Sequence, residues 1–463
     1  MEDYVLQASA AQPADAAAHI FNAGGRWAML TVESGRLYAP DEGLLDPLRE
    51  AMAVGDEARL RMLMTAVGVA APENLGGSIP SSVPVRSFSL TIAAKCNLVC
   101  AYCYAEGGNF GGADKSMSLD VALRAVKSLI DDAATGEHVR LIFMGGEPLT
   151  NRSGLREATK FAAGYAASKG VTVDFSLTTN ATLLTEDDAD FLDEYRFAVT
   201  VSIDGIGATH DKARPDRGGH GTYERVIGRL RHLVERRQRR CHIAARVSVT
   251  PNNLELPEIL TGLADLGFDR IQFAPVIASP SGSCSLDTKE LDLMLAQMIA
   301  CSERFEALLA EGKTLPFANL IETLARIHKG SRDEYPCGAG GSYLGVSTDG
   351  GLYACHRFVN DDDARMGDID VGLNQNSQAD WLARRNVQFQ EPCKSCWARH
   401  LCGGGCHYDV INRGRLFCDY IRGWLDHCLG VYVRLASERP HQLASILGVE
   451  VASEARRDVL PPN

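Results

Sequence analysis

The stretch SFSLTIAAKCNLVCAYCY, residues 87–104, decides the fold. Its first part, 87–93, is an apolar run typical of a buried strand. Cys96, Cys100 and Cys103 follow within eight residues. Cubane iron–sulfur clusters are held by cysteine thiolates, normally four of them. Three cysteines in one loop therefore predict a cluster whose fourth iron stays open to a small chelating molecule.

A zinc loop, or a chance grouping of cysteines, is the alternative interpretation of this triplet. Structural zinc sites usually take paired CxxC units and close at four ligands. No partner pair stands near residues 96–103, and Tyr102 and Tyr104 give the loop an aromatic setting. Iron is therefore the better interpretation.

Strand and helix patterns alternate beyond this loop. Helices are predicted over 118–133, with Ser118 as N-cap, and finally over 287–312. Five further strand patterns, separated by helical ones, cover residues 139–146, 171–180, 196–204, 243–251 and 269–277. Strands rich in Val, Ile and Phe that alternate with helices predict a parallel sheet with right-handed crossovers. Six such units are too few for a closed eightfold barrel, so we expect an α/β fold with a partial (β/α)6 barrel over 86–330.

Short motifs stand at the C-terminal ends of these strands, where chemistry is found in such sheets. The cysteine loop follows the first strand, Gly145-Gly146-Glu147-Pro148 the second, Thr179-Asn180 the third and Asp204-Gly205 the fourth. Each is weak alone, because GGEP can be an ordinary turn and polar residues often satisfy strand ends. Their convergence on one rim predicts a single site.

The composition is that of a globular protein, with 45% hydrophobic and 23% charged residues. A net charge of −12 argues against nucleic acid as the main partner. No apolar stretch is long enough to span a bilayer. Residues 1–19 open with two acids and lack the order of a signal peptide. We therefore predict a cytoplasmic protein that binds neither nucleic acid nor membranes.

Fourteen cysteines in a reducing compartment indicate metal binding or catalysis more often than disulfides. Three form the triplet, and eight more lie beyond residue 336. Cys241, Cys284 and Cys301 stand alone and are predicted to be buried structural thiols. The thiols thus divide into two functional groups.

The regions that flank the barrel differ from it. Residues 1–85 predict a small α+β domain: two short strands joined by a turn at Glu33-Ser34-Gly35, then a helix, and a linker over 72–84. The last region, 331–463, is rich in glycine and cysteine. We expect a small domain held by metal rather than by a large apolar core.

Three motifs together resemble the radical S-adenosylmethionine (SAM) superfamily: CNLVCAYCY at 96–104, FMGGEPL at 143–149 and SIDG at 202–205. The resemblance implies an oxidoreductase in which a 4Fe–4S cluster on the triplet cleaves SAM. The 5′-deoxyadenosyl radical so formed removes a substrate hydrogen, and a flavodoxin or ferredoxin supplies the electron. The residues it implies for cofactor binding are Tyr102, Gly145, Gly146, Glu147, Pro148, Asn180, Ser202 and Arg214.

The cysteine-rich region resembles the SPASM domain, which carries auxiliary 4Fe–4S clusters in peptide-modifying radical enzymes. The resemblance implies that one cluster is completed by Cys393, Cys396, Cys402 and Cys418. A second cluster would be bound by Cys337, Cys355 and Cys406. Zinc remains the alternative for the CxxC portion. Cys428 could fill the vacancy or be a core thiol ten residues along a helix from Cys418; we favour the core thiol.

Two positions separate this chain from sulfatase-maturing relatives. Those place a further cysteine shortly after the first one, where this chain has GAGGSYLGVS at 338–347, and an acid where it has His356. The stretches YCYAEGGNFGG, CHRF, CWARHLCGGGCHYD and FNAGGRWAMLTVESGRLY instead resemble thioether-forming peptide maturases. That resemblance implies bonds between a cysteine sulfur and a carbon of an acidic residue within a partner polypeptide.

Alternatives remain open. Another peptide chemistry is one: carbon–carbon crosslinking, epimerisation or formylglycine formation. A non-catalytic scaffold for a peptide or cluster is another, which the open iron disfavours. The N-terminal segment resembles elements that bind leader peptides by strand addition. A structural cap on the barrel is the alternative there.

Overall fold

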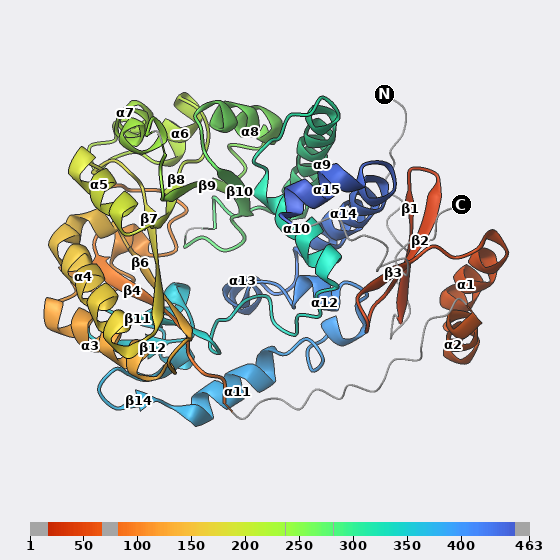
Figure 1. Ribbon diagram of the computed structural model, residues 1–463, viewed down its shortest axis with the longest axis horizontal. Coiled ribbons are helices and arrows are strands. Elements are labelled where there is room, and N and C mark those ends of the chain that lie inside the picture. The colour runs from red at the N-terminus through yellow and green to blue at the C-terminus, as the bar shows by residue number, and fades with distance from the viewer. Residues whose placement is uncertain (1–16, 67–81, 237, 281, 450–463) are drawn as a thin grey trace.

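The computed structural model describes residues 17–66, 82–236, 238–280 and 282–449. Six parallel strands form its centre (Figure 1). They are β4 (Ser87–Ala94), β6 (His138–Gly145), β7 (Thr172–Thr179), β8 (Ala198–Ser202), β9 (His242–Val249) and β10 (Arg270–Pro275). Their order in the sheet is β10-β9-β8-β7-β6-β4. The prediction of an α/β partial barrel is confirmed.

Helices follow these strands as predicted. They are α3 (Leu119–Asp131), α4 (Arg152–Lys169), α5 (Glu186–Glu194), α6 (Ala208–Ala213), α7 (Tyr223–Val234), α8 (Leu256–Asp265) and α9 (Thr288–Ala310). Ser118 caps α3, because its side chain accepts a hydrogen bond from the Val121 amide. Figure 1 shows α3, α4, α5 and α7 outside the strands, so one face of the sheet is covered by helices.

The other face of the sheet looks into the barrel. Side chains alternate along a strand, so the buried Ile243, Ala245 and Val247 of β9 pack outward and the residues between them face inward. Arg246 therefore belongs to the inner face. The pairing register places it level with Ser202 of β8 and Gln272 of β10.

The C-terminal region continues the barrel sheet. Strand β11 (Tyr343–Val346) pairs in parallel with β4. The antiparallel strands β12 (Gly351–Tyr353), β13 (Arg365–Asp368) and β14 (Gly372–Leu373) extend it, and β5 (Lys115–Ser116) pairs with β4. Leu344, Leu352 and Trp424 share the core of the barrel. The expectation that this region lacks a large apolar core is wrong, because its scattered apolar residues complete a core begun elsewhere. The contribution of metal stays a prediction.

Further helices surround this extension. They are α10 (Ala318–Lys329), α11 (Gln375–Arg385), α12 (Arg399–Cys402), α13 (His407–Arg413), α14 (Cys418–Glu438) and α15 (Pro440–Leu447). The long helix α14 packs against α9, α10, α15 and β1. It therefore joins the end of the barrel to both ends of the described chain.

The N-terminal unit is a three-stranded sheet with two helices beside it (Figure 1). Its elements are β1 (Ala18–Ala23), β2 (Arg26–Thr31), β3 (Arg36–Tyr38), α1 (Glu42–Val54) and α2 (Glu57–Ala66). The prediction of two strands and one helix is wrong in number. A turn at Gly24-Gly25, with φ of 66° and 92°, divides the first predicted strand, and glycine allows that geometry.

Two expectations lie outside the described residues. These are the N-terminal stretch 1–16 and the part of the linker at 72–81. In the described ranges, no helix combines the length and apolar character needed to cross a membrane. The domain boundaries at 85/86 and 330/331 stay a prediction.

Candidate functional site

The cysteine triplet lies in the loop that leaves β4. The Cys96 sulfur accepts hydrogen bonds from the Leu98 amide at 3.4 Å and the Asn180 Nδ2 at 3.8 Å. The charges of Cys96, Cys100 and Cys103 act on one another. Burial raises the pKa of Cys100 to about 12, so a thiolate there needs a cation such as iron beside it. The donor set therefore fits a cluster held by Cys96, Cys100 and Cys103.

The Gly145-Gly146 pair packs directly against this loop. Gly145 has φ of 135°, and a Cβ on it would lie 2.2 Å from the Ala93 carbonyl oxygen. A Cβ on Gly146 would lie 2.3 Å from the Lys95 carbonyl oxygen. Both positions therefore require glycine. The pair brings the end of β6 against the backbone that presents Cys96.

Glu147 is completely buried behind the rim. Its Oε1 accepts hydrogen bonds from the Thr179 hydroxyl at 2.7 Å and the Leu149 amide at 3.0 Å, and its Oε2 accepts one from the Asn180 amide at 2.7 Å. Burial raises the pKa of Glu147, while these donors oppose the change. The carboxylate thus ties β6 to β7. The predicted cofactor contact would therefore come from the backbone of 145–148.

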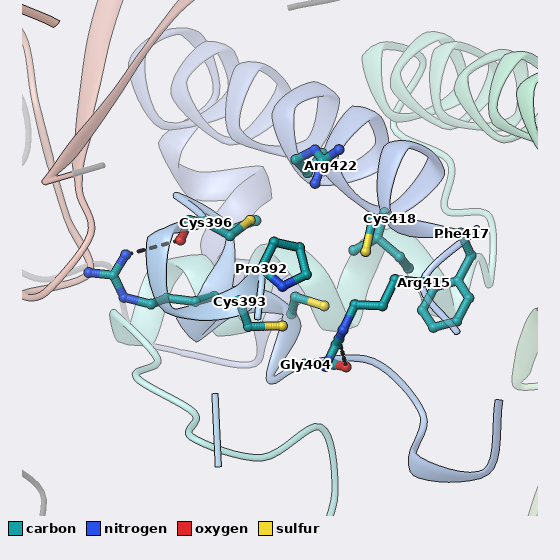
Figure 2. A pocket seen from close by; sticks show the side chains of 12 residues that line it. Pro392, Cys393, Cys396, Gly404, Arg415, Phe417, Cys418 and Arg422 are labelled. Carbon is teal, nitrogen blue, oxygen red and sulfur yellow. Dashed lines mark hydrogen bonds between the residues drawn. The ribbon is translucent and has the colours of Figure 1, made fainter. Parts of the chain in front are cut away.

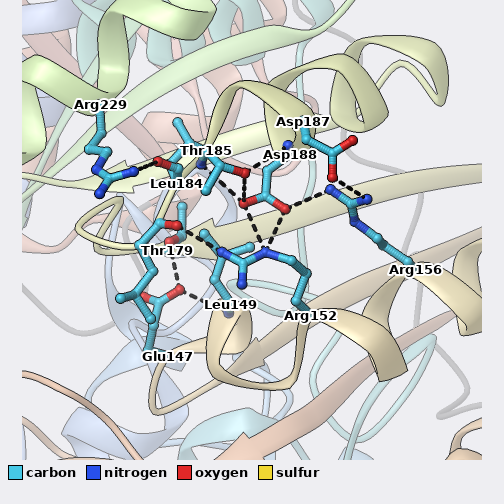
Figure 3. A network of polar contacts seen from close by, with 11 residues as sticks. Glu147, Leu149, Arg152, Arg156, Thr179, Leu184, Thr185, Asp187, Asp188 and Arg229 are labelled. Carbon is cyan, nitrogen blue, oxygen red and sulfur yellow. Dashed lines mark hydrogen bonds and ion pairs between the residues drawn. The ribbon is translucent and has the colours of Figure 1, made fainter.

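A second carboxylate supports the same rim from outside (Figure 3). Asp188 accepts hydrogen bonds from Arg152 Nε at 2.7 Å and Arg156 at 2.9 Å, and it forms a capping box with Thr185 at the start of α5. Arg152 also donates to the Leu183 carbonyl. These bonds fix the segment after β7, which carries Asn180.

The structure brings the other predicted rim residues together. Asn180 is buried, and its Nδ2 also donates to Asn97 Oδ1 at 3.0 Å. Pro148 is buried at the start of the turn after β6. Ser202 ends β8 on the inner face, level with Arg246. Their roles in cofactor binding stay predictions.

Tyr102 and Arg214 form a buried pair behind the triplet. Arg214 donates to the Tyr102 hydroxyl and lies 3.5 Å from Asp204 Oδ2, and its guanidinium stands over the Tyr102 ring. Tyr102 donates in turn to Asp204. Asp204 was placed on the rim by its sequence position, but its partnership with Tyr102 and Arg214 was missed. An acid directly after a strand was the available indication.

Four cysteines of the C-terminal region line one pocket (Figure 2). We name them the four-cysteine set: Cys393, Cys396, Cys402 and Cys418. The charges of all four act on one another. Burial raises the pKa of Cys402 to about 11. Arg415 crosses the pocket and donates to the Gly404 carbonyl at 2.7 Å. The donors fit a fully ligated cubane.

Three other cysteines, the three-cysteine set, lie together elsewhere: Cys337, Cys355 and Cys406. Burial raises the pKa of Cys355 to about 12. Arg357 donates to the Cys406 sulfur at 3.4 Å and pairs with Asp409 at 3.0 Å. Within the described residues, no fourth cysteine is among the principal charges that act on this set. The donors fit a cubane with one open iron.

Aromatic residues separate the three-cysteine set from the triplet. The Tyr104 ring contacts His356 and Tyr408 edge-on, and Arg357 lies over both tyrosine rings. His356 Nδ1 is 2.6 Å from the Tyr343 hydroxyl. Burial, together with the nearby arginines, lowers the pKa of His356 to about 3. His356 is therefore neutral and a weak base. The surroundings of Cys406, with Arg357 and Asp409, were not predicted from the sequence.

The remaining cysteines lie apart from these sets. Cys428 is fully buried in α14 and bonds to Thr323 of α10. Ten helical residues separate it from Cys418 by about 15 Å, so its place in the core agrees with the favoured interpretation. Cys241 and Cys301 are buried as expected, whereas Cys284 is partly exposed.

No three His, Cys, Asp or Glu side chains among the described residues converge tightly enough to share one metal ion. Thiolates that hold a cubane bind different irons and so need not meet at one point. All fourteen cysteines are free of disulfides.

Residues 90–245 match the model of the Radical SAM superfamily. A serine-type anaerobic sulfatase-maturating enzyme of Klebsiella pneumoniae is 24% identical over 359 residues, covering 75% of this chain and 88% of its own. A cysteine-type anaerobic sulfatase-maturating enzyme of Clostridium novyi is 24% identical over 373 residues, covering 74% and 95%. The structure of native anSMEcpe with bound AdoMet and Cp18Cys peptide superposes with a TM-score of 0.64 at 21% identity, covering 76% of this chain and 99% of that one.

A cysteine triplet in the loop after β4, a GGEP turn packed on it and the superfamily match define a radical SAM enzyme, with SAM and a 4Fe–4S cluster as its cofactors. Over about three-quarters of its length this chain is related to the anaerobic sulfatase-maturating enzymes.

Proposed function

We propose that this enzyme modifies a partner polypeptide by forming intrapeptide thioether bonds, each from a cysteine sulfur to a carbon of an acidic residue. Its motifs resemble those of the quinohemoprotein amine dehydrogenase maturation protein. The relationship to sulfatase-maturating enzymes, one of them solved with a peptide, supports a peptide substrate.

The observation that carries the proposal is the three-cysteine set. Cys337, Cys355 and Cys406 provide three donors where a cubane normally takes four. An open iron can hold a substrate thiol as a thiolate. An open iron that binds the substrate thiol serves thioether formation, whereas a non-catalytic scaffold has no need of one.

The electron balance agrees with this assignment. When bound, SAM and the triplet cluster supply a 5′-deoxyadenosyl radical that removes one hydrogen atom from the target carbon. Closing the carbon–sulfur bond then releases the thiol proton and one electron. Auxiliary clusters at the other two cysteine sets would accept that electron. The peptide therefore loses two hydrogens.

Residues of this chain would prepare that step. Arg357 contacts the Cys406 sulfur and is itself fixed by Asp409 and by the Tyr408 ring at 4.0 Å. The cation sits beside the thiolates and favours the charged sulfur. Tyr104, directly after the triplet, packs between the two sites and excludes water.

Formylglycine formation is the second candidate, because sulfatase-maturating enzymes are the relatives found. That chemistry needs a base beside the target residue. His356 occupies the position where those enzymes are expected to carry an acidic residue as the base. Its low pKa makes His356 a poor base. This residue favours the thioether proposal.

The N-terminal unit would bind the partner's leader segment by strand addition at an edge of β1 or β3. A flavodoxin or ferredoxin would supply the electron. A cytoplasmic location would keep the cluster thiols reduced.

An anaerobic assay with a cysteine- and acid-bearing partner polypeptide tests the proposal. We expect 5′-deoxyadenosine and a product two mass units lighter that has lost one alkylatable thiol. A product of unchanged mass would contradict the proposal and indicate epimerisation instead.

A further inference from the structure

The barrel interior holds a cavity of about 420 Å³ between β8, β9 and β10. Inward-facing Thr200, Ala244 and Gln272 line its walls, and small side chains leave the space open. A volume of this size accommodates a small ligand or one side chain with its backbone. Its lining runs from the exposed N-terminal ends of the three strands, at Ala198, His242 and Arg270, up to Arg246, which is level with Ser202.

Arg246 is the cation in the upper part of this cavity. Its side chain is exposed to the barrel space, and its Nη1 donates a hydrogen bond to the neutral Gln272 amide oxygen. A guanidinium has five N–H donors, so most of its capacity is unused there. In the described ranges Arg246 forms no ion pair with a carboxylate, whereas Arg270, at the exposed N-terminal end of β10 in the same cavity, pairs with Glu322.

Charged and titratable groups beside both cysteine sites act on Arg246. Tyr104, next to the triplet, and Cys406, Arg357 and Asp409 of the three-cysteine surroundings all act on it. Asp409 is already paired with Arg357. Within the described residues Arg246 is thus left without a carboxylate partner, and its side chain faces the cavity.

We propose that Arg246 anchors a carboxylate-binding site in the barrel interior, and that the carboxylate is an acidic side chain of the partner polypeptide. The inference rests on the proposed function, since it names the side chain that carries the target carbon. Bidentate arginine–carboxylate pairing would fix that side chain between the triplet and the three-cysteine set. The carboxylate of SAM is an alternative ligand with the same chemistry. The arginine beside the triplet is Arg214, however, which donates to Tyr102 within the triplet loop.

The test measures binding without turnover, by anaerobic calorimetry on cluster-loaded enzyme saturated with SAM. The probes are N-acetylaspartate N-methylamide and its asparagine counterpart. Wild type should bind the acid at least about 10-fold more tightly, as a charged bidentate pair implies. Arg246→Gln should remove that preference, and Arg246→Lys, which keeps the charge but not the fork, should reduce it several-fold.

Arg270→Gln combined with Glu322→Gln is the matched control, because it removes both charges of an existing ion pair in the same cavity; it should keep the preference. Iron content and melting temperature check each variant, and Arg246→Lys carries the test if Arg246→Gln does not fold. A wild type without acid preference overturns the proposal. So does an Arg246→Gln variant that keeps the preference, or one that loses only SAM affinity, which would assign the arginine to the cofactor.

These outcomes are separate from those of the proposed function. A product with a carbon–carbon crosslink would contradict thioether formation while leaving the acid preference in place. Loss of the preference with an intact thioether product would contradict only the role of Arg246.

Discussion

The two cysteine sets of the C-terminal region differ in completeness and in charge. The four-cysteine set surrounds its own pocket and is crossed by Arg415, which bonds to backbone (Figure 2). The three-cysteine set has one donor fewer, and Arg357 contacts it and also lies over the Tyr104 ring beside the triplet. The first arrangement suits a cluster that passes electrons. The second suits a cluster that also holds substrate.

The largest effect is expected from Cys406→Ala. Two thiols cannot retain a cubane, so the variant should lose about four irons per chain and about 100-fold or more in crosslinked product. SAM cleavage at the triplet should persist, measured as 5′-deoxyadenosine. Full product formation by this variant would remove the functional distinction between the sets.

Arg357→Met should destabilise the surroundings of the three-cysteine set. It leaves the buried Asp409 without its cation, which costs about 3 kcal/mol in the free energy of unfolding. Anaerobic denaturant titration measures the change. Adding Asp409→Asn should recover much of the loss, and failure to do so would mean that the pair is not what Arg357 stabilises.

Cys418→Ala should have a smaller effect than Cys406→Ala, because three thiols remain in the four-cysteine set. We expect a loss of about 10-fold in product. Electron paramagnetic resonance of the reduced enzyme should show an altered, but present, auxiliary cluster. A loss as large as that of Cys406→Ala would mean that the four-cysteine set also acts at the substrate.

The smallest effect is expected from Glu33→Gln, at the contact between the N-terminal sheet and the four-cysteine set. Glu33 pairs with Arg399, which donates to the Cys396 carbonyl at 3.1 Å. His400 and Arg399 lower the pKa of Glu33 from 4.5 to about 2.

Because that pKa is lowered, the stabilisation is present above pH 4.5 and is lost as the pH falls toward 2. The pair is partly exposed, so at neutral pH the variant should lose about 1 kcal/mol. Thermal unfolding at pH 7 and pH 4 measures it. Equal stability of variant and wild type at pH 7 would contradict the contact.

Local pattern was sufficient for the barrel and for the triplet. Alternating strand and helix periods identified all six parallel strands, and the cap at Ser118 came from its residue type. Chain order alone put the triplet and GGEP on one rim. Chain order could not show that the Glu147 side chain accepts hydrogen bonds from Thr179 and Asn180 at the end of β7.

Long-range packing accounts for the rest. Pairing of β11 with β4 joins residues some 250 positions apart, and no local period encodes it. The same holds for Arg357, which meets Cys406 and Asp409 only after folding. The N-terminal strand count failed because the Gly24-Gly25 turn was taken as part of one strand.

The most direct test of thioether formation is the product itself. After anaerobic reaction with a cysteine- and acid-bearing partner polypeptide, the product is reduced with dithiothreitol, alkylated with iodoacetamide and analysed by tandem mass spectrometry. For each bond we predict a loss of two mass units, one fewer alkylated cysteine, and fragments that stay linked between that cysteine and an acidic residue. A product with every cysteine alkylated, whether its mass changes or not, would contradict the account.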